Sequence, residues 1–95
     1  MVVSKKDWSL FRERLPEWQE HYMEQLTREY ITLLGVESER ASDRFWALYG
    51  RIRNDRRSPG VRLEMRKSAM IYDLVHLLAD GVICMDDLKN FSEDT

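Results

Sequence analysis

Residues 8–33 read WSLFRERLPEWQEHYMEQLTREYITL, and the spacing of their apolar side chains predicts the fold. An α-helix brings residues three and four apart onto one face, whereas a strand would place apolar residues at every second position. The stretch therefore predicts a helix with an aromatic stripe along one side. The stripe consists of Trp8, Phe11, Leu15, Trp18, Tyr22, Leu26, Tyr30 and Leu33.

The residues flanking this stretch predict where the helix begins and ends. Ser4 can cap its start by accepting a hydrogen bond from the amide three residues on, and Asp7 places negative charge in the first turn. Gly35 provides a C-terminal stop.

Pro16 leaves two alternatives open for this helix. A proline in a helix interior removes one hydrogen bond and disfavours helical geometry at the residue before it, so the chain either kinks or breaks there. The stripe keeps its phase across Pro16, which favours one kinked helix over two short ones.

Two further helices are expected to form a hairpin that packs against the first. One is capped by Ser38 or Ser42, has an apolar face with Trp46 at its edge, and ends near Arg57. That apolar face consists of Phe45, Leu48, Tyr49 and Ile52. After the break at residues 58–60, the next helix is predicted over residues 61–79, basic in its first half and apolar nearly all round in its second.

The prediction is therefore an all-α fold with a long or Pro-kinked N-terminal helix, a helical hairpin and a short C-terminal helical segment. Ninety-five residues fit one small helical bundle, so a single domain over residues 1–95 is expected. A lone cysteine, Cys84, excludes an internal disulfide, and we expect a cytoplasmic protein with no membrane span.

Positive charge is concentrated between the second and third predicted helices. Residues 51–67 contain seven basic and two acidic side chains, although the whole chain has a net charge of −2. Because Lys and Arg neutralise phosphates, this segment is a candidate polyanion-binding site. Its other interpretation is the solvated end of a helical hairpin. The candidate residues are Arg51, Arg53, Arg56, Arg57, Arg62, Arg66 and Lys67.

No motif in the sequence indicates catalysis, a cofactor or a metal. Asp73, His76 and Asp80 share one face of a predicted helix, a pattern that can poise a histidine base. The tight Cys and His spacings of structural zinc sites are absent from the sequence, so the expected role of this face is the polar edge of a core helix.

The aromatic stripe offers the main functional hypothesis. A first helix of thirty residues is longer than its predicted neighbours, so its N-terminal end should overhang and expose Trp8 and Phe11. We therefore expect a non-enzymatic interaction module that binds another protein or forms a homodimer. The predicted interface residues are Trp8, Phe11, Leu15, Trp18 and Tyr22. The alternative is a nucleic-acid-associated regulator that contacts phosphates through Arg51 to Lys67.

Overall fold

The computed structural model describes residues 3–91, so the predicted domain 1–95 extends beyond them at both ends. Three α-helices follow one another, α1 (Lys5–Leu34), α2 (Ala41–Asp55) and α3 (Met70–Ala79), with short 3-10 turns at Lys67–Ala69 and Met85–Leu88. No strand occurs in this part of the chain, and the all-α prediction is confirmed. Nor is any helix within residues 3–91 both long and apolar enough to cross a membrane.

Helix α1 runs without a break through Pro16, so the alternative of two short helices is wrong. Proline has no amide N–H, so the backbone carbonyl one turn before Pro16 lacks its usual partner within the helix. Because Pro16 is exposed, that carbonyl can bond to water instead. Both predicted ends are confirmed. The Ser4 hydroxyl accepts a hydrogen bond from the Asp7 amide at 3.1 Å, and the Gly35 amide donates to the Ile31 carbonyl at 3.0 Å.

Helix α2 begins one residue before Ser42, and the cap position belongs to Arg40. The predicted serine cap is therefore wrong, since neither Ser38 nor Ser42 occupies that position and no side chain caps the helix.

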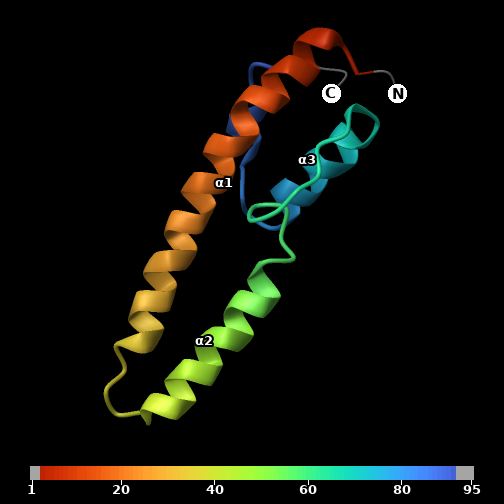
Figure 1. Cartoon of the computed structure of the whole chain (residues 1–95). Coiled ribbons are helices and arrows are strands. Elements are labelled where there is room, and N and C mark those ends of the chain that lie inside the picture. The colour runs from red at the N-terminus through yellow and green to blue at the C-terminus, as the bar shows by residue number, and fades with distance from the viewer. Residues whose placement is uncertain (1–2, 92–95) are drawn as a thin grey trace.

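The third helix is shorter than predicted because residues 61–66 are not helical. The amides of Val61 and Arg62 both donate to the Ser58 carbonyl at 3.0 Å, which closes a turn, and Arg66 is fully extended at φ −136° and ψ 131°. The apolar side chains at positions 61, 63 and 65 are two residues apart. Residues with this spacing do not lie on one face of an α-helix, so the segment is better suited to an extended conformation. The predicted hairpin of the second and third helices is consequently replaced by an antiparallel pair of α1 and α2 (Figure 1).

The hydrophobic core lies at one end of the molecule, between the first half of α1, helix α3 and the segment after it (Figure 1). We call this end the head. Phe11 and Leu15 of α1 are almost fully buried there, against Met70 and Leu77 of α3. The cluster is completed by Val3, Leu74, Val82 and Ile83.

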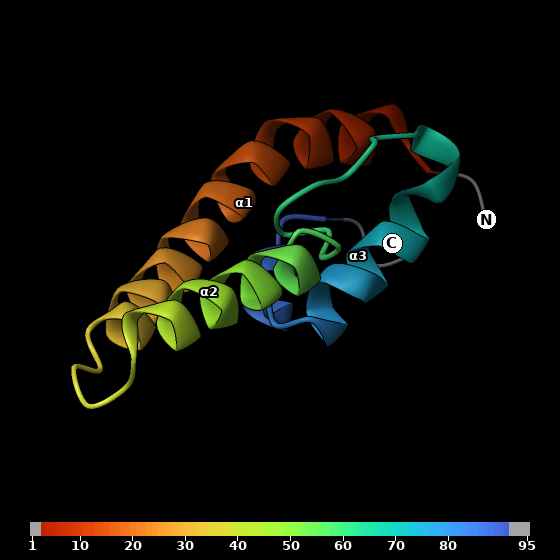
Figure 2. The ribbon, with the colours of Figure 1, turned by 60° about the horizontal axis from the view of Figure 1, so that its bottom comes forward.

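The second half of α1 and helix α2 project from the head as a two-helix arm, defined as residues 23–55 (Figure 2). The radius of gyration is 16.4 Å, whereas a compact domain of this length would have about 12 Å. Leu26 is buried, but no other residue of the arm is. The part of α1 that extends beyond the core is therefore its C-terminal half. The sequence had predicted that the N-terminal end would overhang.

The turn at residues 58–62 reaches the core because position 60 is glycine. A Cβ added at Gly60 would overlap the Tyr22 ring and would lie 2.6 Å from Cγ2 of Val82. A side chain would therefore push the turn away from α1.

We expect Gly60→Ala to lower the free energy of unfolding by about 1–3 kcal/mol, the usual cost of overpacking. Gly50→Ala is the matched control, because a Cβ at Gly50 meets no atom within 4 Å. Alanine is the better helix former, so this control should stabilise α2 by up to about 1 kcal/mol. Urea denaturation followed by circular dichroism measures both, and equal effects of the two substitutions would contradict the close approach of the turn.

Candidate functional site

The five predicted interface residues lie in the head. Phe11 and Leu15 are 0% and 1% exposed, while Trp8, Trp18 and Tyr22 are half-buried against the same cluster. The expectation that Trp8 and Phe11 overhang is wrong, because α3 and the segment that follows it cover this end of α1. A surface for association must therefore be sought elsewhere on the chain.

Three of the exposed aromatic side chains gather on α2. Phe45, Trp46 and Tyr49 are 62%, 63% and 54% exposed, and α2 contains no buried residue. Their rings pack edge to face in series, with centroids 5.1 Å apart for Phe45 and Trp46 and 5.8 Å for Trp46 and Tyr49. Edge-to-face stacking of this kind holds the rings in a fixed relative arrangement.

One open side of the arm is apolar along most of its length. Phe45, Tyr49 and Ile52 are spaced by four and three residues and share one side of α2. An apolar groove of about 210 Å³ runs between Ile52 and residues Met23 and Thr27 of α1, which shows that these lie on the same side of the arm. Ile31 and Leu34 follow Thr27 by four and seven residues. They therefore lie on the same side of α1 as Thr27. We call this surface the hairpin face: Met23, Thr27, Ile31, Leu34, Phe45, Tyr49 and Ile52.

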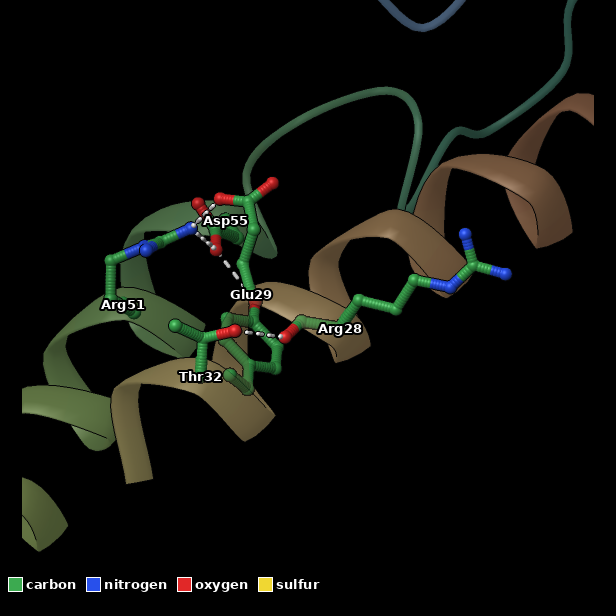
Figure 3. Close-up of polar contacts among 6 residues, drawn as sticks. Arg28, Glu29, Thr32, Arg51 and Asp55 are labelled. Atoms are coloured by element: carbon green, nitrogen blue, oxygen red, sulfur yellow. Dashed lines mark hydrogen bonds and ion pairs between the residues drawn. The ribbon is translucent and has the colours of Figure 1, made fainter. Parts of the chain in front are cut away.

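Polar contacts join the two helices of the arm next to this groove (Figure 3). Arg51 of α2 lies 2.9 Å from a carboxylate oxygen of Glu29 and 3.5 Å from one of Asp55. The Tyr30 hydroxyl donates to Asp55 Oδ2 at 2.6 Å, and the Arg51 guanidinium stacks over the Tyr30 ring at 5.5 Å. We call these four residues the clasp. It fixes how α1 and α2 sit against each other and leaves the hairpin face open.

Two of the seven predicted polyanion-binding residues are already engaged by acidic neighbours. Arg51 belongs to the clasp, and Arg66 lies 3.1 Å from Glu64. Arg53 and Lys67 are exposed and do not line the hollow that the other three share. The remaining three, Arg56, Arg57 and Arg62, line one shallow hollow of about 570 Å³.

The face of α3 that contains Asp73, His76 and Asp80 adjoins this hollow. His76 Nε2 lies 3.7 Å from Asp80 Oδ2, which also accepts a hydrogen bond from the Ser58 hydroxyl at 3.0 Å. Asp73 is 7% exposed, and burial raises the pKa of its carboxyl, although His76 and Arg66 oppose this. Within residues 3–91, no group of three or more acidic, His or Cys side chains is arranged to hold a metal ion.

Sequence reasoning missed the hairpin face because it assigned the apolar side of α2 to the core. The number of aromatic residues in the sequence could have indicated that an exposed aromatic surface exists. Ten aromatic residues exceed what the small core of a 95-residue chain can cover on every side, so some had to remain outside it. Periodicity identifies which residues share a side of a helix but not what lies against that side.

No family model, curated protein or solved structure matches this chain.

The clasp makes the arm sensitive to alkaline pH. Burial, followed by the hydrogen bond to Asp55, raises the pKa of Tyr30 from its ordinary value of 10.0 to about 12. The unfolded chain loses this proton near pH 10 and the folded chain only near pH 12. Tyr30 therefore contributes stability that is fully present below pH 10 and is lost as the pH rises towards 12.

We expect Tyr30→Phe to lower the free energy of unfolding at pH 7 by about 1 kcal/mol, the net value of one hydrogen bond. The variant should also lose less stability than the wild type between pH 10 and about 12. Tyr49→Phe is the control at pH 7, since the Tyr49 hydroxyl has no hydrogen bond to any described residue and its removal should have little effect. Urea titrations at a series of pH values measure this, and identical alkaline profiles for Tyr30→Phe and the wild type would contradict it.

Proposed function

We propose that this protein is a non-enzymatic interaction module of the cytoplasm that associates with a second copy of itself through the hairpin face. The observation that carries the proposal is the row of exposed aromatic side chains on a helix with no buried residue. An exposed and contiguous apolar patch of this kind is typical of a protein interface. The single unpaired cysteine is in keeping with a reducing compartment.

The uncovered area is large enough for a specific dimer. If a whole large side chain has about 150–250 Å² of surface, the exposed fractions leave roughly 600 Å² uncovered on each copy. Two copies that cover this surface on each other would bury about 1,200 Å², the lower end of the range for specific interfaces. The residues in this sum are Ile31, Leu34, Phe45, Tyr49 and Ile52 of the hairpin face, and Trp46, whose ring packs against Phe45 and Tyr49 at its edge.

The shape of the arm favours a second copy over an unrelated partner. Two antiparallel helices with one open apolar side are half of a four-helix bundle, in which each helix packs against two neighbours. A two-fold axis along the bundle would place α1 of one copy against α2 of the other. Both copies would then contact each other through the same surface, the hairpin face, as in an isologous interface.

The charges beside the hairpin face support this pairing. Glu20 and Glu24 of α1 precede Thr27 by seven and three residues, whereas Arg53 of α2 and Arg56 just after it follow Tyr49 by four and seven. The head end of the face thus has acidic residues along α1, although Glu24 is paired with Arg28 at 2.9 Å, and basic residues along α2. Packing α1 against the α2 of the partner sets opposite charges against each other, which favours that orientation over α1 against α1.

We expect sedimentation equilibrium to show a dimer for the wild type at about 100 µM, and a monomer for Phe45→Glu at the same concentration. A carboxylate at position 45 would be buried without a partner in the bundle, which should weaken association at least about 100-fold.

Val75→Glu is the matched control, because Val75 is a similarly exposed apolar residue on a helix of the head. It should leave the dimer intact. Circular dichroism of each variant excludes unfolding as the cause. A monomeric wild type, or a dimer that Val75→Glu weakens as much as Phe45→Glu does, would overturn the proposal.

A further inference from the structure

Two features that are separate in the sequence meet in one hollow of the head. The basic segment after α2 contributes Arg56, Arg57 and Arg62, and the first turns of α3 contribute Tyr72, Asp73 and His76. We call this site the arginine hollow. It is open and shallow, with a volume of about 570 Å³.

The basic side of the arginine hollow has little opposing charge. Within residues 3–91, none of Arg56, Arg57 and Arg62 forms an ion pair, in contrast to Arg51 and Arg66. Glu64 also lines the hollow, but it lies 3.1 Å from Arg66. Three unpaired guanidiniums around one hollow favour an anion with several oxygens, and the planar fork of Arg suits phosphate in particular.

The α3 side of the hollow offers an aromatic ring and a hydrogen-bond acceptor. Tyr72 is 69% exposed, and its ring contacts the His76 ring edge to face at a centroid distance of 6.1 Å. Asp73 is more than nine-tenths buried, and its Oδ2 has no hydrogen-bond partner among the described residues. Oδ2 itself exposes almost no surface, so the Asp73 side chain would have to turn towards the hollow to meet a donor, which would relieve the cost of an unsatisfied buried oxygen.

We propose that the arginine hollow binds a nucleotide, with the phosphate held by Arg57 and Arg62, the base stacked on Tyr72 and a base amino group donating to Asp73. A ligand that carries only phosphate would leave the tyrosine ring and the carboxylate unused. A ligand that carries only an aromatic ring would leave the guanidiniums unpaired. A nucleotide supplies all three groups on one molecule, either free or as one unit of a single strand.

This site shares one residue with the proposed dimer interface but can be tested separately from it. Arg56 lines both the arginine hollow and the groove of the hairpin face, so it is left unchanged in the test. The other residues of the hollow belong to the head and its connecting segment, outside the hairpin face.

Isothermal titration calorimetry of the full chain with GMP, inorganic phosphate and a short single-stranded RNA tests the proposal. We expect GMP to bind more tightly than phosphate, because only GMP reaches Tyr72. Arg57→Ala and Arg62→Ala should each weaken GMP about tenfold, as expected for a lost hydrogen bond to a charged group. RNA that binds more tightly than GMP, with the same losses in both variants, would identify the strand as the source of the nucleotide.

Two variants distinguish a nucleotide site from general basic charge. Tyr72→Leu should weaken GMP about tenfold, since a stacked base is lost, and should leave phosphate binding unchanged. Arg53→Ala is the matched control, because Arg53 is an exposed arginine of α2 outside the hollow, and it should bind GMP as the wild type does.

Three results would overturn the proposal, provided that circular dichroism shows each variant folded. One is no binding of GMP at about 5 mM, a concentration at which even millimolar affinity would be seen. The others are an Arg53→Ala loss as large as that of Arg62→Ala, and GMP binding that Tyr72→Leu does not change.

Discussion

Burial of Phe11 and Leu15 beneath α3 is the constraint on which the rest of the structure depends. Truncating one fully buried Phe or Leu typically costs about 2–5 kcal/mol, a large part of the 5–15 kcal/mol that stabilises a whole domain. The head contains every member of the main core cluster, so it anchors α1 by its first half. The second half of that thirty-residue helix has no core to lie on and projects with α2 as the arm.

The arm is held mainly by the clasp, whose ion pairs are partly exposed. Exposed ion pairs contribute little, about 0–1 kcal/mol each, and a helix of fifteen residues is only marginally stable by itself. Leu26 is the one buried apolar residue that assists them in the arm. A second copy on the hairpin face would supply the apolar burial that the arm lacks, and its stability would then depend on association.

The proposed association and nucleotide sites meet at the end of α2. Arg56 lines the groove of the hairpin face on one side and the arginine hollow on the other. The turn at residues 58–62 forms the boundary between them, and its close approach to Tyr22 and Val82 keeps it in place. This turn thus separates the hairpin face from the arginine hollow.

The sequence by itself determined the all-α class and the two ends of helix α1, its Ser4 cap and its stop at Gly35, but it left open whether Pro16 breaks the helix. These features depend on contacts between residues a few positions apart, which spacing reveals. Only the tertiary structure decided which end overhangs, that α2 pairs with α1, and that Arg62 and Asp73 line one hollow. Which segment packs on an apolar helix face depends on residues distant in the sequence. The periodicity of the helix itself contains no information about those residues. For that reason the stripe of α1 and the face of α2 read alike in the sequence, yet the first half of the stripe is core and the face of α2 is surface.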